Sequence, residues 1–288
     1  MRTAVSKHPL VAFFLLAFSL SWIAVLPLVL NPAQAPEPFL ILGALVGPTL
    51  SALIVLGLTE GRSAFRPFLA RYLQWRAGLL WWLIVLFGAL VALTIVAAVV
   101  VGPQLLGGFM SNIGRLLPTY LITLLAGTIL GPLWEEPGWR GFALPRLQGQ
   151  YGPLAGALVL GFLWALWHAP GFFGGWLGGS PLALLVSGLA FSIIMSWVYN
   201  NTRGSILLMI LLHSSSSAAI SVGIFVLPSN LSAAASALVN SGWIPALTYS
   251  LAALVVVLAS RGRLSFTDQE IRIDPQGVNE QERQMSGP

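Results

Sequence analysis

Two kinds of residue are scarce in this sequence: it has no cysteine, and only 8% of its 288 residues are charged. Without cysteine there is no disulfide, no thiolate metal site and no cysteine nucleophile. A soluble globular domain has about 25% charged residues, so a water-soluble fold of this length is excluded as well. The class of protein that matches these shortages is a membrane protein.

Apolar residues are abundant instead, at 57% of the chain. They form repeated runs of about 20 residues, each long enough to cross a hydrocarbon core of about 30 Å. We therefore expect an all-α, polytopic membrane helical bundle with eight transmembrane helices, formed by residues 1–263. The polar segment 264–288 is expected to be disordered or to lie on the surface. The predicted spans are Pro9–Leu30, Phe39–Leu58, Gly78–Val101, Leu116–Leu144, Leu154–Ala169, Pro181–Tyr199, Ser205–Val226 and Trp243–Ala259.

Positive charges are distributed unevenly between these spans. Ten lysines and arginines would lie on one side of the membrane, whereas the segments of the other side hold only Arg115. Because such residues stay on the cytoplasmic side, both termini are predicted to be cytoplasmic, in the cell membrane of a bacterium or archaeon. The cations form no basic stripe, so no nucleic-acid partner is expected. A cleaved signal peptide is an alternative, but the first apolar run exceeds the about 7 to 15 residues of such a segment.

Ionisable residues inside the predicted spans occur on three of the helices. Glu135, Glu136 and Arg140 lie in the fourth span, His168 in the fifth and His213 in the seventh. Each costs at least ~2.5 kcal/mol at the centre of a membrane helix, so these groups need mutual pairing or a wet cavity. Such a cluster indicates a functional site.

Counting along the helices places three of these residues at a similar depth. At a rise of about 1.5 Å per residue, Glu135 lies roughly 14 Å from the cytoplasmic end of its helix, His213 roughly 18 Å and His168 roughly 21 Å. This estimate requires Pro137 to bend the fourth helix without ending it.

Small residues predict where the helices pack. Gly43 with Gly47, and Gly127 with Gly131, fit the small-xxx-small pattern of close helix approach. On the fourth span, small and polar residues at every fourth position predict the inward face: Thr119, Thr123, Gly127, Gly131 and Glu135.

Three short motifs resemble those of a known family. The run from Glu135 to Arg140 matches Glu-Glu-x-x-x-Arg, the run from Trp164 to His168 matches Phe-x-x-x-His with Trp in place of Phe, and the run from His213 to Ser217 matches His-x-x-x-Asn with Ser in place of Asn. In this order over residues 116–220, they resemble the CPBP intramembrane metallopeptidases, also known as the type II CAAX prenyl endopeptidase or Abi family.

The resemblance implies roles for these residues. Glu135 would be the general base that activates water, and His168 would assist at that water. His213 and Ser217 would stabilise the oxyanion. Three supporting residues are implied as well: Glu136, its ion-pair partner Arg140, and Trp164.

The resemblance leaves the cofactor open. The family is often called metallopeptidase, and Glu135, His168 and His213 would then be the zinc ligands. A metal-free glutamate mechanism is the other reading. In both, the site would lie in a cavity open to the cytoplasm and lined elsewhere by Phe162, Trp164 and Phe191. The substrate would be a membrane-associated peptide or protein, and the sequence does not say whether it is prenylated.

Two other function classes stay open at this point. A noncatalytic bacteriocin-immunity or scaffold protein of the same fold would need the cluster only for packing, with Glu136 and Arg140 as a buried ion pair. A proton-coupled transporter would use the buried glutamate and histidines as a relay. Its expected pseudo-symmetric halves are not seen in the sequence.

Overall fold

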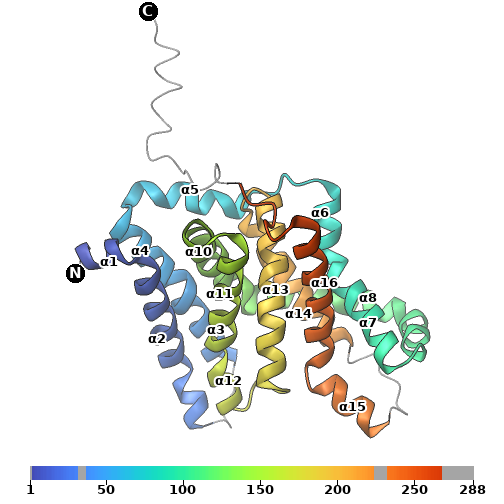
Figure 1. Ribbon diagram of the computed structural model, residues 1–288. Helices are drawn as coiled ribbons and strands as arrows, with labels where there is room; N and C mark the ends of the chain where they lie inside the picture. Colours follow the sequence, from blue (N-terminus) through green and yellow to red (C-terminus); the bar gives the residue numbers. More distant parts are fainter. Residues whose placement is uncertain (1, 32–36, 224–231, 268–288) are drawn as a thin grey trace, which may run out of the picture.

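The computed structural model describes residues 2–31, 37–223 and 232–267, and every element assigned there is a helix (Figure 1). In chain order the elements are α1 (Arg2–Lys7), α2 (Pro9–Leu30), α3 (Glu37–Ala44), η1 (Leu45–Thr49), α4 (Leu50–Thr59), η2 (Arg62–Ala64), α5 (Phe65–Ala70), η3 (Arg71–Leu73), α6 (Leu79–Leu83), η4 (Ile84–Gly88), α7 (Ala89–Val101), α8 (Gln104–Leu130), α9 (Pro132–Glu136), η5 (Pro137–Ala143), α10 (Leu144–Tyr151), α11 (Pro153–Trp167), α12 (Ala169–Phe173), α13 (Pro181–Asn201), α14 (Ile206–Gly223), α15 (Ala233–Asn240) and α16 (Trp243–Ser260). Of the η elements, η1, η4 and η5 are π-helical and the others are 3-10 turns.

Eight helical segments in the described residues are long and apolar enough to cross a membrane. They are Pro9–Leu30, Pro38–Thr59, Leu79–Val101, Gln104–Leu130, Pro153–Phe173, Pro181–Asn201, Ile206–Gly223 and Trp243–Ser260. The expected all-α polytopic membrane bundle is thereby confirmed. Seven spans agree with the predicted ones to within a few residues, apart from 224–226, which lie outside the described residues.

The fourth span differs from the prediction at both ends. Residues 104–115, expected as a loop, form the first half of α8, where Asn112 Nδ2 donates to Gly108 O at 2.8 Å, one turn earlier. The helix then breaks at Gly131, where φ is −150° and ψ is −72°, and Pro132 opens the next helical segment. That segment, 132–151, comprises α9, η5 and α10 and carries the first motif. We call it the motif helix.

The predicted continuation of the helix through Pro137 is confirmed. Helical backbone lies on both sides of this residue, with α9 before it and the π-helical η5 after it. Arg140, three residues later, is only 1% exposed. The first motif thus stays inside the bundle and does not form a surface loop.

The predicted inward stripe of α8 was wrong by one residue. The buried face carries Leu116, Tyr120 and Leu124, continued by Thr128, whose hydroxyl donates to Ser214 Oγ at 2.8 Å. The reason is the break at Gly131: a stripe counted through to Glu135 joins two helices whose phases are independent.

The two glycine pairs behave differently. A Cβ at Gly43 would lie 2.9 Å from Val25 Cγ1, and one at Gly47 only 1.7 Å from Ser21 Oγ, so α3 and η1 do approach α2 closely, as predicted. A Cβ at Gly127 would meet nothing within 4 Å. The pair formed by Gly127 and Gly131 is therefore no packing motif.

The arginine-rich segments gather at one end of the bundle, at the top of Figure 1. Arg71, after α5, donates from Nε to Gly204 O at 3.1 Å, and Asn200 Nδ2 donates to Leu264 O at 2.9 Å. We call this end the arginine-rich end; its assignment to the cytoplasm stays a prediction. Leu264 is fully buried, so the polar tail begins with a packed residue, and its residues 268–288 lie outside the described residues.

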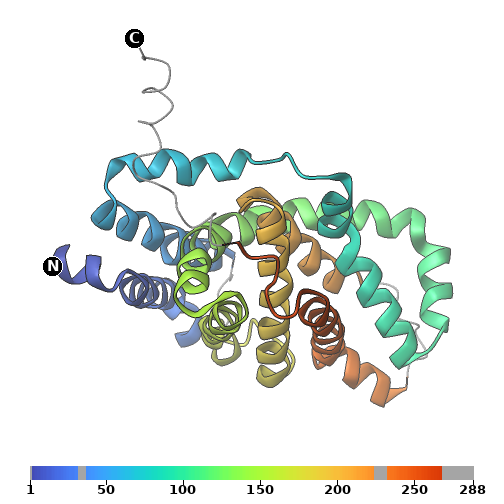
Figure 2. The same cartoon turned by 45° about the horizontal axis from the view of Figure 1, so that its top comes forward.

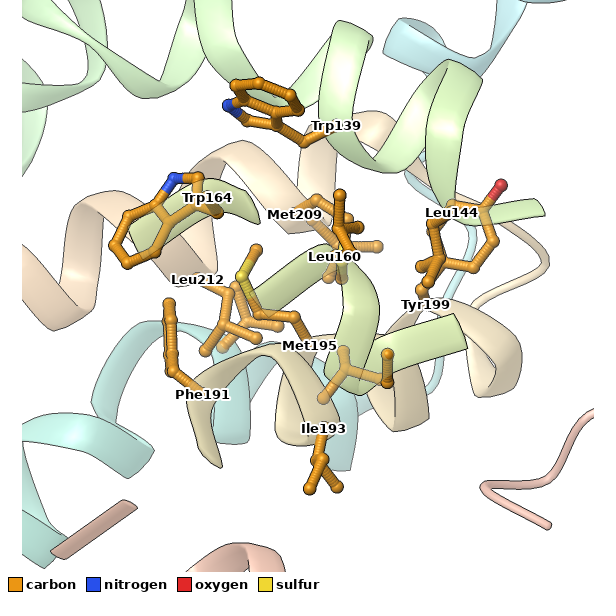
Figure 3. Close-up of a cluster of buried hydrophobic side chains, with 14 of the residues drawn as sticks. Trp139, Leu144, Leu160, Trp164, Phe191, Ile193, Met195, Tyr199, Met209 and Leu212 are labelled. Carbon is orange, nitrogen blue, oxygen red and sulfur yellow. The ribbon is translucent and has the colours of Figure 1, made fainter. Parts of the chain in front are cut away.

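One part of the core lies between the motif helix and three helices that follow it, α11, α13 and α14. Figure 3 shows Trp139 and Leu144 facing a cluster of apolar side chains that includes Leu160, Met195 and Met209. Figure 2, turned from the first view, shows that α5 crosses over the arginine-rich end rather than running along the bundle. Apolar side chains thus surround the buried side of the motif helix, which also carries Glu135, Glu136 and Arg140.

Candidate functional site

The first and third motifs meet through one carboxylate. Glu136 Oε1 accepts from Arg140 Nη1 at 3.0 Å and from His213 Nδ1 at 2.7 Å. Glu136 and Arg140 are at most 1% exposed, and His213 is 8% exposed. Because a carboxylate accepts, His213 carries its proton on Nδ1, which leaves Nε2 as the ring nitrogen that can reach a substrate.

Trp164 of the second motif connects Glu135 and His168. Its indole Nε1 donates to Glu135 Oε2 at 3.2 Å, and its carbonyl accepts from His168 Nδ1 at 2.8 Å. A carbonyl only accepts, so His168 also carries its proton on Nδ1 and presents Nε2. His168 lies at the junction of α11 and α12, where the first of these helices ends.

Trp164 also contacts both imidazoles. Its ring centroid lies 4.4 Å from that of His168 and 5.6 Å from that of His213, in edge-to-face geometry. The structure therefore brings Glu135, His168 and His213 around a single indole, although they come from three separate helices. Sequence reasoning had assigned this residue only a supporting role. A larger role for Trp164 could have been predicted from the sequence, since a buried indole N–H normally has a hydrogen-bond acceptor.

Two backbone carbonyls of the π-helical η5 accept hydrogen bonds from arginine side chains. Arg71 Nη1 donates to Gly141 O at 3.0 Å, and Arg146 Nη1 donates to Phe142 O at 2.8 Å. Arg146 also pairs with Glu60. Burial lowers the pKa of Arg146, and the Glu60 carboxylate opposes that shift. The arginine-rich end thus holds the motif helix through its backbone.

Gly138, inside the first motif, lies against the backbone of a neighbouring span. A Cβ at this position would lie 2.4 Å from Pro48 O in η1. We expect Gly138→Ala to lower the free energy of unfolding by about 1–3 kcal/mol, because backbone cannot move aside as a flexible side chain does. Unfolding in mixed detergent micelles, followed by tryptophan fluorescence, measures this.

A matched control for this variant is Gly127→Ala. Its Cβ enters open space within a helix, so stability should stay unchanged or rise by about 0.5–1 kcal/mol. Equal loss of stability in both variants would contradict the close contact between Gly138 and η1.

A cavity of about 200 Å³ lies beside His213, between α13, α14 and α16. Trp164, Phe191 and Ser217 line it together with His213. Ser217, to which the resemblance assigns an oxyanion contact, is exposed and faces this cavity. Phe162, predicted as a lining residue, is 49% exposed on the outside of α11 and is not among the residues that line it.

One residue of this cavity was missed in the sequence. Tyr249 on α16 lines it, and its hydroxyl lies 2.5 Å from Ser216 Oγ. Its ring packs on Phe191 at 5.0 Å, and the ring of Phe191 in turn lies 6.3 Å from that of His213. No local pattern connects positions so far apart in sequence.

A zinc site is not assembled by the described residues. No group of three His, Cys, Asp or Glu side chains among them, Glu135, His168 and His213 included, lies close enough to hold a metal ion. The two histidines do present Nε2 with Nδ1 anchored, as metal ligands commonly do. The described residues nevertheless form an incomplete donor set for a metal ion.

Comparison with known proteins agrees with the motifs. A family model described as type II CAAX prenyl endopeptidase Rce1-like matches residues 116–219. This segment is similar to an Rce1-like domain. It contains all three motifs, so the resemblance seen in the sequence is confirmed over this part of the chain.

A curated relative matches part of the same chain. The protein named CAAX prenyl protease 2 from Methanococcus maripaludis is 34% identical over 122 residues, which cover 38% of this chain and 42% of the relative. The match thus spans less than half of the relative's length. Its name describes that protein, and an activity for the present chain has to be argued from the geometry of the site.

Proposed function

We propose that this protein is an integral membrane endopeptidase that hydrolyses a peptide bond of a membrane-associated protein by means of a glutamate-activated water. The observation that carries the proposal is the junction at Trp164, where a buried carboxylate and two oriented imidazoles meet within the segment that is similar to an Rce1-like domain. We place the protein in the cell membrane with both termini cytoplasmic, on the distribution of its arginines.

Glu135 is the general base of this mechanism. Its Oε2 is held by the Trp164 indole, and the carboxylate can take a proton from a water that then attacks the carbonyl carbon. His168 supports this step, because its Nε2 lone pair can accept the second hydrogen of the same water. The proton that Glu135 receives passes to the leaving amine when the C–N bond breaks.

His213 and Ser217 stabilise the oxyanion. For Nε2 of His213 to donate, the ring must carry protons on both nitrogens. The Glu136 carboxylate, held by Arg140, then balances the charge of the imidazolium. Ser217, one turn later on α14 and facing the same cavity, supplies a hydroxyl donor. Donors fixed where negative charge develops are what amide hydrolysis needs most.

Comparative membrane proteomics tests the proposal. Cells that carry the wild-type chain should contain at least one cleavage product that is absent from cells with Glu135→Gln at equal protein abundance. Identical peptide patterns in the two strains would contradict a peptidase and favour the noncatalytic reading. A solute flux that depends on Glu135 would favour the transporter reading.

A further inference from the structure

A short helical connection joins the second span to the third at the arginine-rich end. It comprises η2, α5 and η3 and runs from Arg62 to Leu73. The span before it ends at Thr59 and the span after it begins at Leu79, so the connection lies between two points where the chain crosses the membrane surface. In Figure 2, α5 lies across the bundle rather than along it. The side chains of the connection are therefore placed at the level of the lipid head groups.

One side of the connection is fixed to the bundle. Phe68 is only 6% exposed, and Arg71 donates to the two backbone carbonyls described above. Ser205 Oγ, just before α14, donates to Gln74 O at 2.6 Å. The connection is thus held in place, and it has little conformational freedom to lose when a ligand binds to its other side.

The other side of the connection is exposed and carries both cations and apolar side chains. Its residues recur at intervals of four, three and four positions, which places them on one face of a helix, and Trp75 and Arg76 continue this face. Leu73 is 79% exposed and Trp75 is 60% exposed. The guanidinium carbon of Arg76 lies 5.8 Å from the centroid of the Trp75 ring. We call this face the outer face; it consists of Arg62, Arg66, Leu69, Leu73, Trp75 and Arg76.

The charge of the outer face is not neutralised by the part of the chain that the structure describes. Arg62 and Arg66 form no ion pair with any residue of that part. The sequence has no acidic residue between Glu60 and Glu135, and Glu60 pairs with Arg146 at the end of the motif helix. The outer face is therefore free to attract an anion from outside the chain.

The combination of residues on the outer face indicates the chemistry of that anion. Arginine binds phosphate groups through two parallel hydrogen bonds. Tryptophan is enriched where head groups meet acyl chains, and leucine side chains are stable on the acyl side of that boundary. A soluble anion would contact the arginines but leave the exposed leucines in water. A phospholipid presents a phosphate and a hydrocarbon layer next to each other, so it contacts both kinds of side chain.

We propose that the outer face binds the head groups of anionic phospholipids, with the guanidinium groups at the phosphates and Leu69, Leu73 and Trp75 among the upper parts of the acyl chains. A zwitterionic lipid has the same phosphate, but its ammonium group cancels the charge, so the outer face prefers the anionic lipid. The proposal does not depend on the peptidase function, because no residue of the outer face belongs to the catalytic cluster or lines the cavity beside His213.

Photo-crosslinking tests which lipid the outer face contacts. The chain has no cysteine, so Ser63→Cys, beside Arg62, can carry a benzophenone on a unique thiol. The labelled protein is reconstituted into vesicles of dioleoyl-phosphatidylglycerol and dioleoyl-phosphatidylcholine at equal mole fractions and illuminated, and the mass of the adduct identifies the captured lipid. Phosphatidylglycerol should be captured at least about fivefold more often than phosphatidylcholine, since one arginine near an anionic surface contributes about this factor.

Two double variants separate the outer face from the overall charge of this end. Arg62→Gln with Arg66→Gln removes two cations from the outer face, and the preference should fall by about fivefold or more, to nearly equal capture. Arg261→Gln with Arg263→Gln removes the same charge from exposed positions after α16 and should keep the preference. Arg62→Lys with Arg66→Lys retains the charge of the outer face and should keep it as well.

A label at the other end of the bundle is the control for position. Ala234 is exposed on α15, and no lysine or arginine occurs between Arg203 and Arg261. Ala234→Cys should therefore capture the two lipids equally. The proposal is overturned by equal capture of both lipids at Ser63→Cys, by no lipid adduct there, or by the same loss of preference in both arginine-to-glutamine double variants.

Discussion

Glu135→Gln should lower the turnover number on the order of 10² to 10⁴-fold, the usual contribution of a general base. Glutamine has the size of glutamate, and its carbonyl oxygen can still accept the hydrogen bond from Trp164 Nε1. It cannot take a proton from water. The turnover number should therefore fall while KM stays nearly unchanged. Both are measured with the purified protein over a range of concentrations of the peptide identified by proteomics.

Glu60→Gln is the control for this prediction. Glu60 also pairs with an arginine, Arg146, but it is exposed at the arginine-rich end. This variant should retain full turnover. Turnover of Glu135→Gln within a few-fold of wild type would mean that Glu135 is architectural, and the peptidase proposal would then lose its base.

The second large effect is expected at Glu136. Glu136→Ala leaves the Arg140 guanidinium buried without its carboxylate and His213 without an acceptor at Nδ1. Breaking a buried ion pair from one side costs about 3–5 kcal/mol of folding free energy. Unfolding of the purified protein in mixed micelles should show this loss, and the peptidase activity should fall with it.

A double variant separates folding from chemistry. In Glu136→Leu with Arg140→Met both charges are replaced by apolar groups of similar length, which often restores the stability that a single change removes. Stability should recover, whereas activity should not, because His213 stays unanchored. A double variant as unstable as Glu136→Ala would argue against the ion pair as the source of the loss. Recovery of activity would show that Glu136 does not act through His213.

Hydropathy and charge were sufficient to predict most of the fold. Runs such as Pro9–Leu30 and Pro181–Asn201 cannot be anything but buried in lipid or protein, so their ends follow from where the apolar residues stop. The start of α8 could not be found in this way. Gly107, Gly108 and Asn112 resemble a loop in composition, and only their hydrogen bonding along the helix shows otherwise.

The site was predictable as a set of residues but not as a network. The cost of burying charge identifies Glu135, Glu136, Arg140 and both buried histidines without any structure. Which carboxylate meets which histidine depends on helix rotation, and the break at Gly131 resets the rotation of the motif helix. The pairing of Glu136 with His213 therefore had to come from the structure, as did the link through Trp164.

The π-helical η5 has a consequence for aligning this chain with its relatives. A π turn contains one residue more than the α turn it replaces, so it corresponds to a single insertion within a helix. Each residue of an α-helix rotates the chain by about 100°, and deleting one residue from 137–143 would therefore turn everything after it by that angle. Glu135 would keep its place while Arg146 moved away from Glu60. An alignment that allows no gap inside this helix would therefore pair residues that lie on different faces of the helix in the two proteins, although all of them are helical.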